Sequence, residues 1–234
     1  DDLYDFCRGH NVFGQVSFTG GNPILYPHLD RIYSEAPDRG FMTAILGNPK
    51  PRDRIKQMLA VQKLEFYQVS LEGLRAHNDF IRGRGHYDRV LNFLKLLGEL
   101  GVYRMVMLTL TQDNIDQILE LAEKMRGLTD LFTFNRMSNV GRGAELSAVP
   151  FDRFPEFLSR YMDSAATNSC IGFKDNLFNL LRWQRGLPLD GGCAGYGCGA
   201  AFNFVALLPD GEVHACRKMP SLIGNIYQKP LNAD

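Results

Sequence analysis

Residues 15–23 of this 234-residue chain, QVSFTGGNP, decide the fold. The stretch opens as a short β-type run, Gln15–Thr19, and closes on a Gly-Gly-Asn-Pro string. Two glycines let a backbone approach a ligand closely, and the carboxyl end of a strand in an α/β protein is where ligands bind. On its own, however, the string is more often a plain turn, because each of its residue types is a common turn former.

The same kind of apolar run returns four more times, and successive runs begin 25 to 38 residues apart. That spacing accommodates one strand, one helix and two loops per unit, which predicts βα units around a parallel sheet. The further strands are expected at Phe41–Leu46, Phe66–Leu71, Arg104–Thr111 and Leu131–Arg136.

Apolar residues at the helical period fill the gaps between these runs, in one case after a cap at Asp113 or Asn114. Five βα units cannot close an eight-stranded barrel, so the pattern predicts an α/β protein with an open or partial barrel. Its site is expected on the loops at the carboxyl ends of the strands. Helices are expected over residues 87–97, 115–125, 154–165 and 175–184.

The composition changes after Pro188, where glycines become frequent. The run Phe202–Leu208, a Pro-Asp-Gly turn and the run Glu212–Cys216 together predict a β-hairpin. We therefore expect two domains, an α/β body over residues 1–188 and a small cysteine-bearing hairpin module over residues 189–234.

Charge and hydropathy exclude several classes of protein. Lysine and arginine number 26 and so do aspartate and glutamate, so the net charge is zero, which argues against nucleic-acid or membrane-surface partners. Hydrophobic residues make up 45% of the chain, as in an ordinary globular protein. No apolar run approaches the 18 or so residues of a membrane span, and we expect no signal peptide.

Polar and charged side chains cluster where two predicted strands end. Ser70 and Glu72 lie at the end of the third strand, and Arg82 comes ten residues after Glu72. A hydroxyl, a carboxylate and a guanidinium together suit a polar cofactor, but a structural pair between Arg82 and Glu72 accounts for them equally well. Asn135 and Arg136 end the last strand, where the guanidinium suggests an anion and a solvated turn is the plainer interpretation.

Three of the five cysteines, Cys193, Cys198 and Cys216, fall within the last 42 residues. Thiolates brought together by glycine-rich loops and a hairpin are typical of an iron–sulfur cluster; structural zinc and buried free thiols are the alternatives. Three thiolates do not complete a set of four, so a further ligand must be of another kind or lie outside these residues. Cys7 and Cys170 stand alone, and we expect both to be small packing residues.

These motifs, in this order, resemble the radical S-adenosylmethionine (radical SAM) enzymes with a SPASM or twitch-type auxiliary-cluster extension, over nearly the whole chain. The resemblance implies a partial (βα)6 barrel, here lacking its first strand, followed by a small Cys-rich β-hairpin module. In that family a Gly-Gly-Glu-Pro motif holds the ammonium group of SAM. The matching residues are Gly20, Gly21, Asn22 and Pro23, and Asn22 keeps the oxygen acceptor but loses the charge.

The same resemblance implies the rest of the cofactor site. Ser70 and Arg82 look like the serine and arginine that hold the ribose and carboxylate of SAM in related maturases, and Glu72 stands where those enzymes often carry Asp. Thr109 and Asn135 are similar in position to residues that line the pocket.

The spacing from Cys198 through Gly211 to Cys216 fits the opening of a SPASM domain, which implies an auxiliary iron–sulfur cluster near these two cysteines and Cys193. One departure is severe. The family holds the 4Fe-4S cluster that reduces SAM with a CxxxCxxC motif, and these 234 residues contain none. We therefore expect the ligands of that cluster outside this chain, and the chain itself to be a fragment.

The function that the resemblance implies is that of a radical SAM peptide maturase, most similar to maturases of ribosomally made peptides, including the selenobiotic-type group. Such an enzyme uses a 5′-deoxyadenosyl radical to abstract hydrogen from a bound peptide. The implied partners are a peptide or protein substrate and a reductant such as flavodoxin or ferredoxin, in the cytoplasm. The alternatives are side-chain oxidation of the anaerobic sulfatase-maturating type and a non-catalytic, zinc-containing peptide-binding module.

Overall fold

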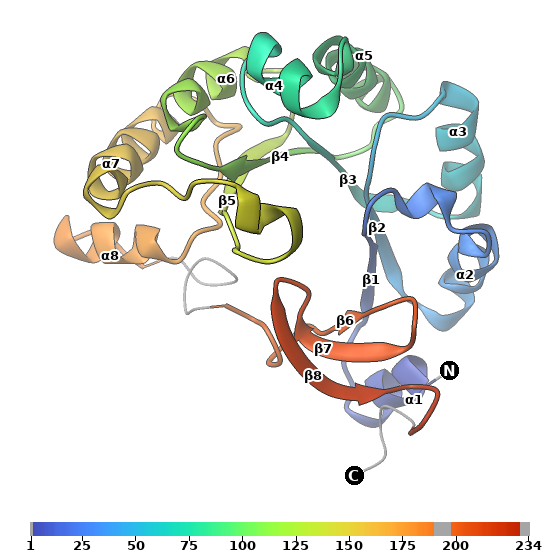
Figure 1. The fold of residues 1–234 in the computed structure, drawn as a ribbon. Helices are drawn as coiled ribbons and strands as arrows, with labels where there is room; N and C mark the ends of the chain where they lie inside the picture. Colours follow the sequence, from blue (N-terminus) through green and yellow to red (C-terminus); the bar gives the residue numbers. More distant parts are fainter. Residues whose placement is uncertain (1, 190–197, 230–234) are drawn as a thin grey trace.

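The computed structural model describes residues 2–189 and 198–229 of the chain. Five parallel strands form a curved sheet whose outer side is lined by helices, so that the body has the shape of a crescent (Figure 1). The strands of the body are β1 (Gln15–Phe18), β2 (Met42–Leu46), β3 (Leu64–Ser70), β4 (Arg104–Leu110) and β5 (Leu131–Arg136). The helices are α1 (Asp2–Gly9), α2 (Leu29–Glu35), α3 (Arg52–Val61), α4 (Arg75–Arg82), α5 (His86–Glu99), α6 (Ile118–Lys124), α7 (Phe154–Ala165) and α8 (Leu177–Gln184), with short 3-10 turns η1 (Pro23–Leu25), η2 (Pro37–Arg39), η3 (Ile115–Gln117), η4 (Gly141–Glu145) and η5 (Phe151–Arg153).

The strands follow one another in the sheet in the order β1-β2-β3-β4-β5, each parallel to its neighbours. Sequential parallel order with helical connections is the arrangement of βα units, and it brings all five carboxyl ends to one rim. The α/β class and the partial barrel predicted from the sequence are therefore consistent with the structure.

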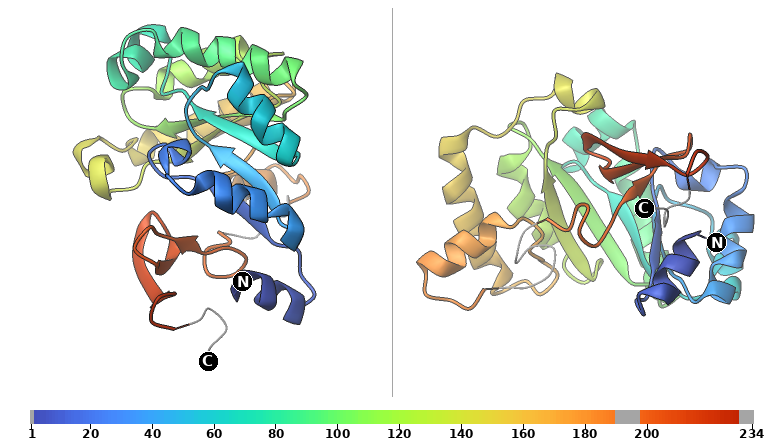
Figure 2. Two further views of the ribbon diagram at one scale, coloured as in Figure 1. Left: turned by 90° about the vertical axis from the view of Figure 1, so that its right-hand side faces the viewer. Right: turned by 90° about the horizontal axis from the view of Figure 1, so that it is seen from below.

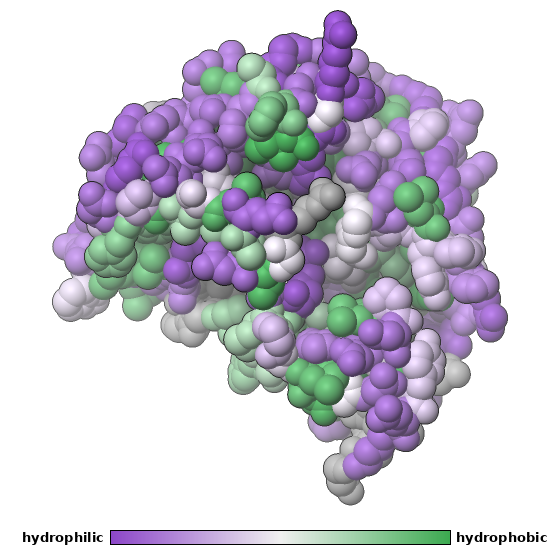
Figure 3. Space-filling model, viewed as in Figure 1, coloured by the Kyte–Doolittle hydropathy of each residue, from purple (hydrophilic) through white to green (hydrophobic). Residues whose placement is uncertain are grey.

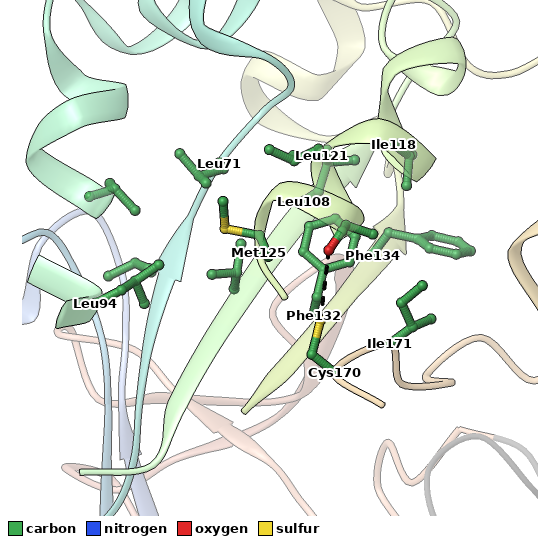
Figure 4. Packing of buried hydrophobic residues seen from close by; sticks show 14 of the residues in the cluster. Leu71, Leu94, Leu108, Ile118, Leu121, Met125, Phe132, Phe134, Cys170 and Ile171 are labelled. Atoms are coloured by element: carbon green, nitrogen blue, oxygen red, sulfur yellow. Dashed lines mark hydrogen bonds between the residues drawn. The ribbon is translucent and has the colours of Figure 1, made fainter. Parts of the chain in front are cut away.

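One face of each strand packs on the helices. Tyr67 of β3 lies edge-on against Phe93 of α5, with ring centroids 4.9 Å apart, and Phe134 of β5 lies against Phe157 of α7 at 5.3 Å. Leucine, methionine and phenylalanine side chains from the strands and helices fill the space between the layers (Figure 4). Because this outer face is mostly apolar, burying it fixes which side of each strand faces the helices.

The opposite, concave face carries polar residues at the rim. Side chains alternate along a strand, so Ser70, Thr109 and Asn135 point away from the helix-packed face that holds Tyr67 and Phe134. Thr109 and Asn135 are paired in the β4–β5 register, and Ser70 is paired with Met107 two residues before Thr109. The register therefore brings three residues expected at the site to neighbouring positions on one face.

A second sheet follows the body. It is antiparallel and contains β6 (Ala206–Leu207), β7 (Glu212–Cys216) and β8 (Met219–Asn225) in that order. It lies against the open side of the crescent, away from helices α4 to α7, in both the front and the side views (Figures 1 and 2). No helix within the described residues is long and apolar enough to cross a membrane.

The predicted strand Phe202–Leu208 is wrong over most of its length. Only Ala206 and Leu207 form strand β6, and the preceding residues form a turn in which Ala201 has a left-handed φ of 59°. Phe202 is 89% exposed, so no burial rewards an extended conformation there. The sequence also gave no signal for β8, which completes the second sheet.

Candidate functional site

The Gly-Gly-Asn-Pro string forms the loop that leaves the carboxyl end of β1. Gly20 has a φ of +112°, a conformation that L side chains rarely adopt, and Cβ atoms built on Gly20 and Gly21 meet nothing within 4 Å. The side-chain oxygen Oδ1 of Asn22 is buried without a hydrogen-bond partner among the described residues. The loop thus combines open space over its backbone with an unsatisfied buried acceptor, which is unusual in a folded protein.

Glu72 and Arg82, which the sequence placed near each other, are bonded to one another. Arg82 Nε donates to Glu72 Oε1 at 3.1 Å, and a second guanidinium N–H reaches the same oxygen. Glu72 is 6% exposed, and its other oxygen accepts the backbone N–H of Thr109 at 3.2 Å. The structure thus contains an ion pair between Arg82 and Glu72, and the carboxylate of Glu72 joins the end of β3 to the end of β4.

Ser70 is the last residue of β3 and is half-buried. Among the residues that the structure describes, its hydroxyl has no hydrogen-bond partner, so it remains available to a ligand on the concave face. Asn135, also half-buried, lies next to Thr109 across the β4–β5 ladder. The expected site residues of β3, β4 and β5 therefore share one stretch of the rim.

Asn114 is a rim residue whose role the sequence missed. It precedes η3, as the expected cap does, but its side chain makes no capping hydrogen bond there. Instead Nδ2 donates to the carbonyl oxygens of Glu72 at 3.0 Å and Thr109 at 2.8 Å, and Oδ1 accepts the N–H of Thr111 at 2.9 Å. An amide that serves both as donor and acceptor satisfies three backbone groups of two separate loops at once.

Arg136, at the end of β5, is paired with an acidic residue of the chain. Its guanidinium binds the carboxylate of Asp175, which is buried, and also reaches Asn176 at 3.3 Å. An acidic residue of the chain itself thus pairs with this arginine, while half of the Arg136 side chain stays exposed.

The turn between β7 and β8 reaches the rim from the second sheet. Arg217 Nη1 donates to the hydroxyl of Thr19, next to Gly20, at 3.1 Å. On the other side of the opening, the hydroxyl of Ser138, in the loop after β5, donates to the carbonyl oxygen of Lys218 at 2.9 Å. Figure 1 shows this turn extending into the open side of the crescent. No local sequence pattern predicts these contacts between distant residues.

Two of the three late cysteines can be placed. Cys216 ends β7, and its sulfur accepts the backbone N–H of Lys218 at 3.4 Å; Cys198 is exposed, and Cys193 lies outside the described residues. Within residues 2–189 and 198–229, no group of three or more His, Cys, Asp or Glu side chains is placed to hold a metal ion.

The ammonium of Lys218 lies in an electropositive environment. Burial lowers its pKa most, the neighbouring charges of Lys174 and Arg217 lower it further, and the thiols of Cys198 and Cys216 act in the opposite direction. Both cysteines are therefore close enough to influence the same ammonium group.

Cys7 and Cys170 are 8% and 5% exposed, as expected for packing residues. Cys170 lies against Phe132 and Ile171 at the edge of the core (Figure 4), and burial raises the pKa of its thiol. A buried thiol kept neutral in this way is a poor nucleophile and a poor metal ligand.

The radical SAM superfamily model matches residues 5–125, slightly more than half of the chain. The antilisterial bacteriocin subtilosin biosynthesis protein AlbA of Bacillus subtilis is 24% identical over an alignment of 221 residues, which covers 89% of this chain and 46% of that protein. The mycofactocin maturase MftC of Mycolicibacterium smegmatis is 28% identical over an alignment of 220 residues, which covers 92% of this chain and 55% of the relative. The chain therefore spans about half the length of these relatives.

The fold is similar to that of a solved structure. SuiB of Streptococcus suis, in a crystal structure with bound S-adenosylmethionine, superposes with a TM-score of 0.74 and 20% identity over 98% of this chain and 56% of SuiB. Enzymes of the superfamily that the family model describes use SAM together with a 4Fe-4S cluster. The order of the five parallel strands and the match over residues 5–125 lead to one conclusion: this chain belongs to the radical SAM superfamily.

Proposed function

We propose that the protein is a radical SAM peptide maturase and that the described rim holds SAM. The observation that carries the proposal is the buried, unpartnered Oδ1 of Asn22 beside the open backbone of Gly20 and Gly21. A buried acceptor without a donor costs free energy unless a ligand supplies the donor. The ammonium group of SAM is such a donor, so these residues fit it.

The remaining polar residues of the rim fit the rest of the cofactor. Ser70, Thr109 and Asn135 present hydroxyl and amide groups on the concave face, which suit ribose hydroxyls. Glu72 binds the Nε and Nη2 edge of the Arg82 guanidinium, so that N–H groups on its other edge remain for a carboxylate. When bound, SAM and a reduced 4Fe-4S cluster supply a 5′-deoxyadenosyl radical, and this chain binds and orients the cofactor and shields it from water.

We also propose that Cys198 and Cys216, together with Cys193, serve an auxiliary iron–sulfur cluster in a SPASM or twitch-type module. Backbone N–H donation to a cysteine sulfur, as from Lys218 to Cys216, stabilises a thiolate ligand and tunes the potential of a cluster. The glycines around Cys198 and the left-handed Gly211, whose φ is +85°, allow the tight turns that such a module needs.

The assignment of a peptide substrate is supported by the two relatives that align over about nine-tenths of the chain, one from bacteriocin biosynthesis and one a maturase. Within the proposal, a one-electron reductant such as flavodoxin or ferredoxin supplies the electron, in the cytoplasm. Side-chain oxidation of the sulfatase-maturating type uses the same scaffold and differs in its substrate protein.

The proposal is tested on the intact enzyme, prepared anaerobically. Iron and acid-labile sulfide are quantified, and SAM is incubated with dithionite-reduced enzyme while 5′-deoxyadenosine and methionine are measured. We expect both iron and sulfide, with SAM cleaved to these two products. Zinc alone, with no cleavage, would identify a non-catalytic binding module instead.

The substrate class needs a separate measurement. A displayed library of random dodecapeptides is selected on the intact enzyme in the presence of SAM. Enrichment of related sequences supports a peptide substrate. Cleavage of SAM without any peptide enrichment would contradict the maturase proposal while leaving a radical enzyme with a substrate of another class.

A further inference from the structure

The turn between β7 and β8 places two cations in succession over the rim. Arg217 is exposed and Lys218 is half-buried. The turn is fixed at both sides of the opening, through Arg217 to Thr19 and through the carbonyl oxygen of Lys218 to Ser138. These hydrogen bonds hold the backbone of the turn and one guanidinium N–H of Arg217 in place beside the Gly20 loop.

Neither cation pairs with a carboxylate among the described residues, although the thiols of Cys198 and Cys216 act to raise the pKa of Lys218. Arg217 uses one of its five N–H groups, towards the neutral hydroxyl of Thr19, and the ammonium of Lys218 makes no hydrogen bond or ion pair in the described part of the chain. Other rim arginines differ sharply, because Arg82 is paired with Glu72 and Arg136 with Asp175. Carboxylates therefore neutralise Arg82 and Arg136, whereas none within the described residues pairs with the two cations of the turn.

The excess of positive charge is local. The chain carries equal numbers of acidic and basic residues, so a general attraction for anions does not explain it. Hydropathy on this face is mostly polar, with apolar residues in separate patches, so the mouth is not an apolar docking groove (Figure 3). Two adjacent cations, one of them partly desolvated, bind an anion more strongly than exposed cations do.

We propose that Arg217 and Lys218 bind the carboxylate of an acidic residue in the peptide substrate; this inference rests on the proposed function and names the substrate group that the second sheet recognises. The planar fork of the guanidinium suits the two carboxylate oxygens, and the ammonium adds a compact point charge. Because the turn lies beside the Gly20 loop, an aspartate or glutamate held there fixes which neighbouring residue of the peptide lies over the cofactor rim.

The experiment uses the random dodecapeptide selection with SAM, on the intact wild-type enzyme and on Lys218→Met and Arg217→Gln. We expect aspartate or glutamate at one fixed position in the peptides selected by the wild type, and loss of that preference with either variant. Lys56→Met is the matched control, since Lys56 is an exposed lysine of α3 on the outer side of the body. It should select the same peptides as the wild type.

A second measurement does not depend on how the variants fold. The most enriched peptide is synthesised with glutamate and with glutamine at the fixed position, and the affinity of the wild-type enzyme for each is measured. We expect the glutamine peptide to bind roughly tenfold more weakly, the loss typical of a charge-assisted contact.

The outcomes distinguish a failure of this inference from a failure of the proposed maturase function. Enriched peptides with no acidic position, or equal affinities for the two synthetic peptides, would overturn the inference and leave the maturase proposal standing. If Lys218→Met weakens SAM binding or lowers the iron content as strongly as it weakens peptide binding, the ammonium serves the cofactor or the cluster instead. Absence of any selected peptide would reject both.

Discussion

Arg82 and Glu72 are hydrogen bonded across ten residues of sequence, and the carboxylate that receives the guanidinium also receives the backbone N–H of Thr109. One side chain therefore joins the end of α4, the loop after β3 and the end of β4. The Glu72 side chain is almost completely enclosed, whereas about a third of the Arg82 side chain is open, at 9% and 35% exposure. An arrangement with the anion inside and the cation at the surface allows Arg82 to face a ligand while remaining anchored.

We expect Glu72→Gln to lower the free energy of unfolding by about 2 kcal/mol. The amide N–H of glutamine would face either the Arg82 guanidinium or the backbone N–H of Thr109, both of which are donors, and the guanidinium would lose its anion. Urea denaturation followed by circular dichroism measures the change. The control is Asp88→Asn, which removes an exposed partner of Arg75, both side chains being more than half exposed. That variant should unfold at the wild-type urea concentration, and equal effects of the two substitutions would contradict the special position of Glu72.

Asn114→Asp tests the residue that joins the loops after β3 and β4. The substitution keeps the size and the acceptor Oδ1 but replaces the Nδ2 donor, so an oxygen faces the carbonyl oxygens of Glu72 and Thr109. We expect a loss of about 2–3 kcal/mol in stability and weaker SAM binding, measured by denaturation and by calorimetry. The control is Asn92→Asp, on the exposed side of α5, which should change neither quantity. Unaltered SAM binding in a stably folded Asn114→Asp enzyme would show that Asn114 does not position the two loops for the cofactor.

Gly21→Val tests the backbone approach at the end of β1. A Cβ at this position meets nothing within 4 Å, so the variant should fold with wild-type stability while its side chain occupies the space above the loop. We expect SAM affinity, measured by equilibrium dialysis, to fall roughly tenfold or more. Gly224→Val in β8 is the matched control, because its Cβ also meets nothing within 4 Å. Wild-type affinity in Gly21→Val would place the cofactor elsewhere.

A cysteine proposed as a cluster ligand and a cysteine packed in the core should respond differently to substitution. Cys216→Ala is expected to lower the iron content of the intact enzyme while the SAM-reducing cluster remains, because one auxiliary ligand is lost. Cys170→Ala should keep all the iron and lose about 1 kcal/mol of stability, since its sulfur is packed in the core. The iron content and the free energy of unfolding are measured for both variants. Full iron in Cys216→Ala would exclude Cys216 as a ligand.

His86 predicts how the stability depends on pH. Burial lowers its pKa most, and the charges of Arg82 and Arg89 lower it further, below the ordinary 6.5. Its Nδ1 accepts from Asn78, whose oxygen accepts the N–H of Glu72, so the neutral ring supports the rim loop. As the pH falls, the unfolded chain binds a proton at this histidine before the folded chain does. The contribution of His86 to the free energy of unfolding is therefore fully present above pH 6.5 and decreases as the pH falls from 6.5 towards the lowered pKa.

Two measurements check this dependence. An NMR titration of the His86 ring should give a midpoint below 6.5, and urea midpoints at pH 7.5 and 5.5 should differ more for the wild type than for His86→Gln. An ordinary midpoint, or the same difference in both proteins, would show that His86 does not carry the effect.

The body of the fold could be predicted from the sequence because its outer strand faces and helix faces are both apolar, and burial repeats at the periods of strand and helix. The first and last residues of the elements could be predicted less closely. Strand β3 begins at Leu64, two residues before the expected start, because Leu64 is 1% exposed and pairs with Thr43 although charged residues flank it. Helix α8 begins two residues late because Asp175 accepts the N–H of Leu177 and binds Arg136.

The parts that could not be predicted lack such a burial signal. Strand β8 contains Pro220 and Gly224 and is an edge strand with most side chains exposed, so neither alternation nor β propensity marks it. The amide of Asn114 suits a helix cap and a bridge between loops equally well, and only the neighbouring loop decides between them. Contacts of Arg217 and Lys218 depend on residues far away in sequence, which no local pattern records.

The two hydrogen bonds that fix the β7–β8 turn have a consequence for how the molecule assembles. They join residues 198 and 80 positions apart, whereas neighbouring strands of the body are separated by a single helical connection. Closing a long loop costs more chain entropy than closing a short one, and contacts distant in sequence form slowly. We therefore expect the crescent to fold first and its mouth to be spanned last, so that during folding the rim passes through a stage in which large cofactors enter without obstruction.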